Sequence, residues 1–345
     1  MNGPAPGSPT AGNPGPADPG SGTPTPTPDP GPTPGPTPGP TPDPNPGPTA
    51  PCPLTWTVER AGNGTPLLAL WGSGASDVWA VGGTTIVHSN GDGSWSTVAT
   101  NAGDSYAAVY GADGWIYVGG TSCSDGLCQG GLLLRSSDGG ASWSRQALGA
   151  GVTRFSGHGT TVYADSADFF ASDDHFATSQ KLPLTWATSV GVFATDGALF
   201  AYGGTRGSTI RRSTDAGQNW ATVYEGFSGS KSGHLDEIVR GDKALFAIAN
   251  GCSVPACEGA VLRSDDGGAS WTLGPRITDW GRGLWAAGDG EVWVGGARMM
   301  RSTDGGASFA AVTLPTATAI EAIWGASADD LYAVGTDGSI LHGKR

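Results

Sequence analysis

From Thr55 onward, short runs of apolar and β-branched residues alternate with Gly, Ser, Asn and Asp. The first runs are Leu67–Trp71, Asp77–Val81, Thr85–His88 and Ser94–Val98. Runs of this length bounded by turn-forming residues are typical of β-strands. No helical periodicity longer than two turns stands out anywhere in the chain. The pattern therefore predicts an all-β domain.

One motif, Ser-x-Asp-x-Gly-x-x-Trp, recurs between these runs. Its clear copies are Ser136, Asp138, Gly140 and Trp143; Ser213, Asp215, Gly217 and Trp220; Ser264, Asp266, Gly268 and Trp271; and Ser302, Asp304, Gly306 and Phe309. Weaker copies near residues 89, 172 and 343 complete seven positions. A period of about 40 residues indicates a β-propeller with one four-stranded blade per repeat. We therefore predict seven blades.

A second signature, Trp-Gly followed by Val-Trp-Ala-Val-Gly, supports this register. It is clearest at 71–83 and recurs in altered form at 110–120, 285–296 and 324–335. The chain ends soon after the third strand of the seventh unit, and Leu54–Val58 matches Ser94–Val98. An N-terminal strand is thus expected to complete the last blade and leave no open edge. The predicted propeller domain spans residues 52–345.

The motif residues have structural roles in this interpretation. Asp and Ser side chains can bond the N–H groups of a turn, and Gly supplies the positive φ that a tight turn needs. The Trp is expected to pack against a neighbouring blade. An Arg precedes each clear copy, at Arg135, Arg212, Arg263 and Arg301, and its repetition indicates a scaffold or surface role.

Residues 1–51 have a different composition. They hold 20 of the 26 prolines and no aromatic residue. Such a segment cannot bury a core and is predicted to be a disordered or polyproline-like linker or tether. It resembles the tether of bacterial exported lipoproteins. No signal peptide is visible, and we expect one to have been removed. Membrane attachment is expected only through a lipid anchor upstream of Met1.

The net charge of −13 argues against nucleic acid and anionic membranes as partners. No apolar run is long enough to span a bilayer. Cys123 with Cys128, and Cys252 with Cys257, occupy matching places in two repeats, which predicts two local disulfides and export to an oxidising compartment. Their spacing does not suit zinc, and no metal or cofactor is expected. The state of Cys52 stays open.

The motif resembles the Asp-box, or BNR, repeat over residues 54–345. Propellers with this repeat include sialidases, xyloglucan hydrolases, the sortilin ectodomain and photosystem II assembly factors. The Trp-Gly signature looks like repeats of exported proteins from myxobacteria and related bacteria. The resemblance implies a fold, and this fold hosts many functions.

A sialidase-like site would need three arginines, a Tyr–Glu pair and an acid/base, and no such set is convincing here. A non-catalytic domain is therefore expected. Propellers usually bind ligands on the face formed by the loops leading into the innermost strands and by the loops between second and third strands. Polar candidates on that face are Arg154, His234, Asp236, Glu237, Arg282 and Glu321, and Trp280 and Tyr106 could add aromatic surface.

Aromatic residues beside carboxylates and arginines suit a peptide or a glycan. The favoured hypothesis is an exported, monomeric binding or scaffold module that recognises a protein or peptide partner through this loop face. A carbohydrate-binding surface lectin is the first alternative. A sialidase-like glycoside hydrolase is the second.

Overall fold

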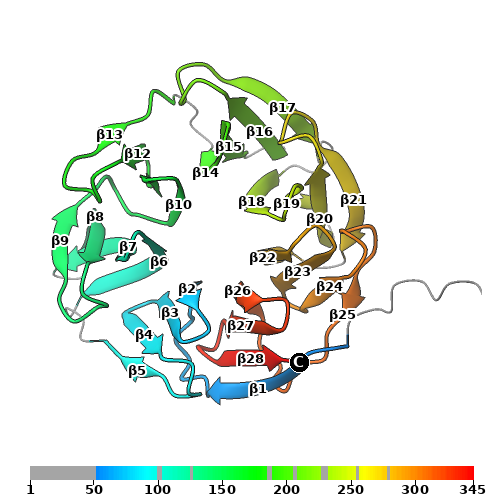
Figure 1. The fold of residues 1–345 in the computed structure, drawn as a ribbon, viewed down its shortest axis with the longest axis horizontal. Helices are drawn as coiled ribbons and strands as arrows, with labels where there is room; N and C mark the ends of the chain where they lie inside the picture. The colour runs from blue at the N-terminus through cyan, green and yellow to red at the C-terminus, as the bar shows by residue number, and fades with distance from the viewer. Residues whose placement is uncertain are drawn as a thin grey trace, which may run out of the picture. The chain divides into compact units, whose positions relative to one another are not determined.

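The computed structural model describes residues 52–98, 103–124, 127–184, 189–204, 208–226, 232–253, 256–277 and 280–345. These residues form seven four-stranded antiparallel sheets, arranged as blades around a central axis (Figure 1). The described ranges contain no helix, and so none that could cross a membrane. The prediction of an all-β, seven-bladed propeller is confirmed. The expected disorder of residues 1–51 lies outside the described residues.

Each blade runs from an innermost strand at the axis to an outermost strand at the rim. Blade 1 contains β2 (Ala69–Gly74), β3 (Asp77–Gly82), β4 (Thr85–Ser89) and β5 (Ser96–Thr97). Blade 2 contains β6 (Asp104–Ala112), β7 (Trp115–Ser124), β8 (Leu127–Ser136) and β9 (Ser144–Ala147). Blade 3 contains β10 (Arg154–His158), β11 (Thr161–Asp165), β12 (Phe169–Ser172) and β13 (Gln180–Lys181).

The remaining blades repeat this order. Blade 4 contains β14 (Ser189–Thr195), β15 (Ala198–Gly203), β16 (Ser208–Ser213) and β17 (Ala221–Gly226). Blade 5 contains β18 (Ser232–Arg240), β19 (Leu245–Ser253), β20 (Ala256–Ser264) and β21 (Thr272–Ile277). Blade 6 contains β22 (Gly281–Ala287), β23 (Glu291–Gly296), β24 (Met300–Ser302) and β25 (Ala310–Ala311). Blade 7 contains β26 (Ile320–Ser327), β27 (Asp330–Gly335), β28 (Ile340–Lys344) and β1 (Thr55–Arg60).

The two ends of the chain close the ring in blade 7. Strand β1 pairs antiparallel with β28, with Trp56 opposite Gly343 and Thr57 opposite His342. The N-terminal strand therefore takes the outermost position of the last blade, as the sequence predicts. Trp56 packs edge-on against Trp293 of blade 6, with ring centroids 5.9 Å apart.

The Ser-x-Asp motif forms the turn between the third and fourth strands of blades 2 to 6, here called the Ser–Asp turn. In blade 2, Ser136 Oγ donates to Asp138 Oδ1 at 2.7 Å and accepts from Gly140 N at 2.9 Å. Ser142 N donates to the same carboxylate at 2.9 Å. The same bonds recur in blade 3, where Phe176 takes the position of the glycine. His175 and Phe176 adopt the positive φ angles of the turn, 58° and 61°. The turn thus survives loss of the glycine.

Aromatic side chains and glycines explain the Trp-Gly signature. Each such Trp lies over the glycine of the adjacent innermost strand. A Cβ on Gly111 would come within 2.2 Å of Trp71, and one on Gly325 within 2.6 Å of Trp285. A larger residue at these glycine positions would displace the ring of the neighbouring blade, which fills the space.

Candidate functional site

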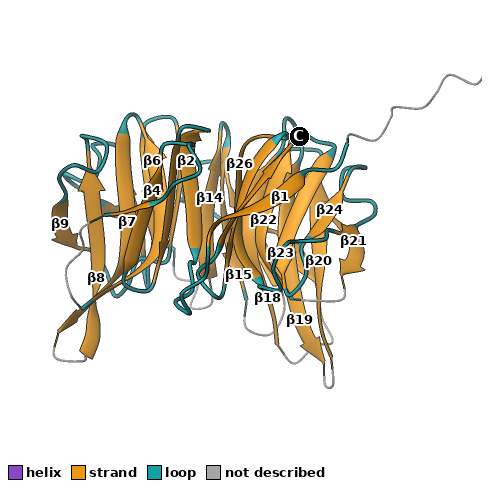
Figure 2. Cartoon of the chain, turned by 90° about the horizontal axis from the view of Figure 1, so that it is seen from below, coloured by secondary structure: helices purple, strands orange, loops and turns teal. Residues whose placement is uncertain are grey.

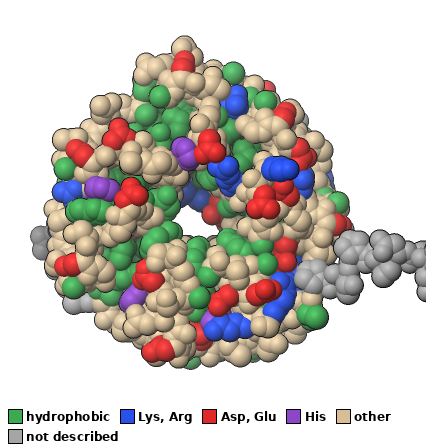
Figure 3. All heavy atoms as spheres, in the orientation of Figure 1, with side chains coloured by type: hydrophobic (Ala, Val, Ile, Leu, Met, Phe, Trp, Pro, Cys, Tyr) green, Lys and Arg blue, Asp and Glu red, His purple; other side chains and the backbone are tan. Residues whose placement is uncertain are grey.

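The seven innermost strands surround an open centre, visible in Figure 3. A cavity of about 390 Å³ lies inside this ring and is lined by residues of all seven of these strands. We call it the central channel. Irregular strand pairing occurs near the start of five innermost strands, at residues 106–108, 189–191, 235–237, 281–284 and 320–322. Such β-bulges re-aim side chains, and they recur here at equivalent positions beside the channel.

Four of the candidate residues line the central channel together: Arg154, Glu237, Arg282 and Glu321. Arg282 Nη1 lies 2.5 and 2.8 Å from the two carboxylate oxygens of Glu321 on the neighbouring blade. Glu237 Oε2 accepts a hydrogen bond from Leu284 N at 2.8 Å, which links blade 5 to blade 6. The structure therefore gathers these charges, which are far apart in sequence, in the lining of one channel.

Two further polar residues approach this cluster, and the sequence analysis missed both. Asp165 and Tyr202 come from the second strands of blades 3 and 4, and both are almost completely buried. Asp165 Oδ2 accepts from Val192 N at 3.0 Å, whereas its Oδ1 has no hydrogen-bond partner among the described residues. A Cβ on Gly191 would lie 2.4 Å from the Tyr202 hydroxyl and 3.0 Å from Asp165. Gly191 therefore makes room for both groups.

Burial controls the ionisation of this cluster. Desolvation raises the pKa of Asp165 to about 7, although the Val192 hydrogen bond and the charge of Arg154 oppose the shift. Desolvation likewise raises the pKa of Glu237 to about 7, against the opposing effects of Arg154 and the Leu284 amide. Burial also raises the pKa of Tyr202. Two carboxyl groups beside the channel thus titrate near neutral pH, which is common at functional sites.

The central channel also has an apolar lining. Most of it comes from blades 1 to 4 and includes Leu68, Leu70, Trp71, Val109, Tyr110, Phe155 and Phe193, and Ile238 and Ile323 add to it from blades 5 and 7. Leu68 is 41 % exposed, a large value for a leucine inside a ring of strands. The central channel therefore presents both charged and apolar side chains to any ligand that enters it.

A second polar group lies between blades 5 and 6. His234 Nε2 is 3.2 Å from Asp236 Oδ1, and its ring lies 4.6 Å from that of Trp280. The buried Asn250 side chain donates to Asp236, and it exchanges two hydrogen bonds with the main chain of Gly281 at 2.7 and 3.0 Å. The three candidates His234, Asp236 and Trp280 are thus brought together, but they are absent from the lining of the central channel.

Tyr106 differs from the other candidates. Its side chain is completely buried in a core shared with Trp79 and Leu132, so it supplies no exposed aromatic surface. The error has a physical cause, because Tyr106 precedes the bulge in β6 and points into the blade instead of the channel.

Two disulfide hairpins stand on one face of the ring. Cys123 is bonded to Cys128 across β7 and β8, and Cys252 to Cys257 across β19 and β20. Figure 2 shows these hairpins at the lower face, whereas the C-terminus lies at the upper face. Arg145 supports the first hairpin by donating to Asp104 Oδ1 and Ser122 Oγ, both at 2.8 Å. Cys52 is exposed and forms no disulfide.

Within the described ranges, no cluster of three or more His, Cys, Asp or Glu side chains is arranged to hold a metal ion. The candidate site presents charged, aromatic and aliphatic side chains. Its residues can hold charged and apolar parts of a ligand at once, and two of them can exchange protons near neutral pH.

Comparison with known proteins identifies the fold. No protein-family model matches the chain, and no curated protein matches it in sequence. Among solved structures, YCF48 bound to D1 peptide is similar with a TM-score of 0.65 and 17 % identity, over 85 % of this chain and 96 % of that one. A streptogramin B lyase has a TM-score of 0.62 and 12 % identity, over 85 % and 98 %. The GH74 enzyme of Niastella koreensis has a TM-score of 0.57 and 17 % identity, over 82 % and 43 %. At these identities the similarity establishes the propeller fold alone.

Proposed function

We propose that the protein is an exported binding module that recognises a protein or peptide partner at the central channel and the surrounding loop face. The observation that carries this proposal is the mixed lining of the central channel. Arg154, Glu237, Arg282 and Glu321 line it together with apolar and aromatic side chains. A peptide offers charged side chains, main-chain polar groups and apolar side chains together, so it suits such a lining.

The similarity to YCF48 supports a peptide ligand, because that propeller has been solved with a peptide bound. The two disulfides support export, because they persist mainly in oxidising compartments. The propeller is proposed to act as a monomer, since its N-terminal strand closes the ring within one chain.

Binding to a peptide array tests the proposal. The intact protein is expected to select a defined set of peptides, and Arg282→Ala is expected to weaken their binding about tenfold by removing a charged partner. Lys181→Ala, which removes an exposed ion pair at the rim of blade 3, is the matched control and should leave binding unchanged. Absence of selective peptide binding, together with clean binding to one sugar class on a glycan array, would favour a lectin instead.

A hydrolase is the second candidate function. It is favoured by the two carboxyl groups, Asp165 and Glu237, whose pKa values are raised to about 7 beside the channel. A carboxylic acid that stays protonated near neutral pH can serve as a general acid. Turnover of fluorogenic glycosides that is lost in Glu237→Gln would establish this function, whereas no turnover across a broad set of glycosides would leave binding as the role of the site.

A further inference from the structure

Main-chain carbonyls of the Ser–Asp turns accept hydrogen bonds from two kinds of donor, one on the preceding blade and one on the blade of the turn itself. The first is an Arg on the third strand of one blade, which donates to a main-chain carbonyl of the turn in the next blade. The pairs are Arg135 with His175, Arg212 with Gly267 at 3.2 Å, and Arg263 with Gly305 at 3.1 Å. The second is the Trp of the motif, which donates to a carbonyl of its own turn, as Trp143 does to Gly140 at 3.1 Å and Trp220 to Gly217 at 2.9 Å.

The seam between blades 6 and 7 has both donors but lacks the turn. Blade 7 has no connection between its third and fourth strands, because β28 and β1 come from opposite ends of the described chain. Arg301 and Trp56 occupy the two donor positions there. Arg301 lies opposite Ala310 as Arg212 lies opposite Ala221, and Trp56 lies opposite Gly343.

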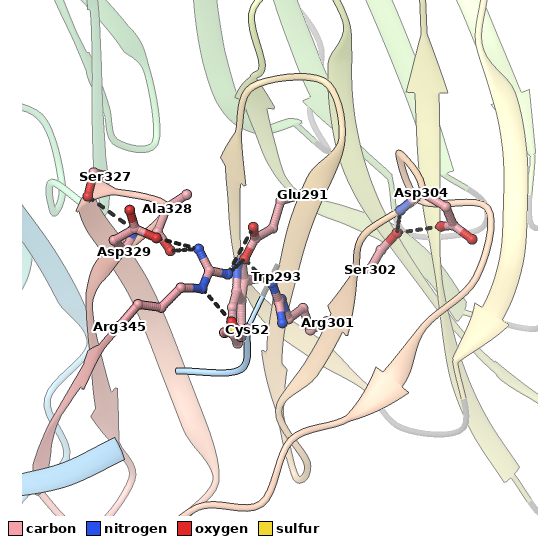
Figure 4. A network of polar contacts seen from close by, with 10 residues as sticks. All are labelled: Cys52, Glu291, Trp293, Arg301, Ser302, Asp304, Ser327, Ala328, Asp329 and Arg345. Atoms are coloured by element: carbon pink, nitrogen blue, oxygen red, sulfur yellow. Dashed lines mark hydrogen bonds and ion pairs between the residues drawn. The ribbon is translucent and has the colours of Figure 1, made fainter. Parts of the chain in front are cut away.

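Both donors are left without an acceptor. Arg301 Nη2 and Trp56 Nε1 are buried and have no hydrogen-bond partner among the described residues. The Trp56 side chain is only 8 % exposed, and the Arg301 side chain is mostly buried as well. The rest of the Arg301 guanidinium is engaged, since its Nε donates to Glu291 Oε1 at 2.9 Å (Figure 4). A buried donor without a partner is costly and needs an explanation.

Cavities lie at both seams of blade 6, but their walls differ. At the seam between blades 5 and 6, the turn of blade 6 forms part of the wall of a cavity of about 520 Å³, and a Cβ on Gly274 would lie 3.3 Å from the carbonyl oxygen of Gly306. At the seam between blades 6 and 7, a cavity of about 530 Å³ has no turn of blade 7 in its wall. We call it the seam cavity. Its lining includes Pro53, Leu54, Trp56, Trp293, Arg301 and the 310–313 segment.

We propose that the seam cavity is a docking site for a tight, glycine-containing turn of a partner polypeptide. Main-chain carbonyls of the bound turn accept hydrogen bonds from Trp56 Nε1 and Arg301 Nη2, as the chain's own turns do at the other seams. Both orphan groups are donors, so the occupant must supply acceptors. Small residues fit the apolar walls, and an acidic residue on the turn complements the positive charge of Arg301. This site is separate from the central channel.

Nuclear magnetic resonance of the full chain, labelled with ¹⁵N, tests the proposal. The probe is a blocked heptapeptide with the sequence of residues 302–308, Ser-Thr-Asp-Gly-Gly-Ala-Ser. We expect the Trp56 indole N–H signal to shift and saturate at millimolar peptide, the affinity expected of a few hydrogen bonds. The Trp271 indole also lacks a hydrogen-bond partner, but its own turn is in place, so its signal should not move. No saturable shift of the Trp56 signal would overturn the proposal.

Three variants test whether the peptide binds in the seam cavity. Ala310→Phe places a ring in the seam cavity from an exposed position, and should abolish the shift of the Trp56 signal. Ala221→Phe is the matched control, because Ala221 holds the equivalent exposed position in blade 4 and should leave binding unchanged. Arg301→Lys should weaken binding about tenfold through loss of one charge-assisted hydrogen bond. Equal effects of Ala310→Phe and Ala221→Phe would place the peptide elsewhere and overturn the proposal.

Discussion

The guanidinium of Arg345, the last residue, lies against the carboxylate of Glu291 on the neighbouring blade, with Nη2 2.9 Å from Oε1 (Figure 4). The same side chain donates to the main-chain oxygens of Ala328 at 2.7 Å and Cys52 at 2.5 Å, and to Asp329 Oδ1 at 2.6 Å. One residue therefore joins blade 6, blade 7 and the segment that leads into β1. It holds the ring closed at the point where no covalent turn connects the strands.

Removal of this side chain should destabilise the propeller. Arg345→Ala leaves the buried Glu291 with only one of its two arginines, and we expect the free energy of unfolding to fall by about 2 kcal/mol. Urea denaturation followed by Trp fluorescence measures the change. Lys344→Ala is the control, because the exposed Lys344 makes only a 4.0 Å contact with Asp330. Equal stability of the two variants would show that Arg345 does not hold the seam.

The glycines beneath the innermost aromatic rings give a second prediction. Gly111→Ala places a methyl group about where the Trp71 ring lies, at 2.2 Å in the unrelaxed structure, so Trp71 must move. We expect a loss of about 1–3 kcal/mol, the usual consequence of overpacking. Gly74→Ala is the matched control, since a Cβ there meets nothing within 4 Å and the backbone needs no positive φ. Thermal unfolding of both variants separates the effect of the Trp71 contact from any general effect of replacing glycine by alanine, because only Gly111→Ala should lower the unfolding temperature.

The covalent state of the five cysteines is directly measurable. Only Cys52 is expected to react with iodoacetamide in the unreduced protein, because the other four form two disulfides. Intact mass spectrometry should therefore show one added group before reduction and five after reduction in denaturant. Labelling of Cys123 or Cys252 in unreduced protein purified from an oxidising compartment would remove the main support for export.

The blades could be predicted from the sequence because each repeat contains its own turn-forming motif and its own short apolar runs. The turn bonds of Ser136 and Asp138 depend on residues a few positions apart. The place of Trp56 in blade 7 could be predicted because the short segment around it matches the fourth strand of another repeat, although its partner Gly343 lies at the other end of the chain. The channel was only partly predictable, because its geometry depends on contacts between blades. The approach of Asp165 and Tyr202 requires the missing Cβ of Gly191, and the inward position of Tyr106 depends on a bulge. No local pattern encodes either feature.

Acid should weaken the Ser–Asp turns. Hydrogen bonds from Ser and Thr side chains and main-chain amides lower the pKa of Asp138 and Asp174 to about 2, from 3.8. A depressed carboxyl pKa contributes stability that is present above the unfolded value and is lost as pH falls through the folded value. The urea midpoint should therefore drop between about pH 4 and pH 2. Asp138→Asn should lower the midpoint at pH 7 and flatten this dependence, and an unchanged slope would contradict the assignment.

The carboxyl groups beside the channel should make the protein less stable as the pH rises, whereas the Ser–Asp turns lose stability as the pH falls. Burial raises the pKa of Glu237 from 4.5 to about 7, so the folded protein holds a proton that the unfolded chain releases above about pH 4.5. This contribution is fully present below the unfolded value and is lost as pH rises through about 7. Stability should therefore decline from pH 5 to pH 8.

Glu237→Gln tests this assignment, because its side-chain oxygen can still accept from Leu284 N but the group cannot ionise. The variant should resist urea better than the parent at pH 8 and to a similar extent at pH 5. Glu258→Gln, which changes an ion-paired carboxylate on a disulfide hairpin outside the channel, is the control and should not gain stability at pH 8. A parallel decline in Glu237→Gln and the parent would mean that another group, with Asp165 the first candidate, controls the alkaline side.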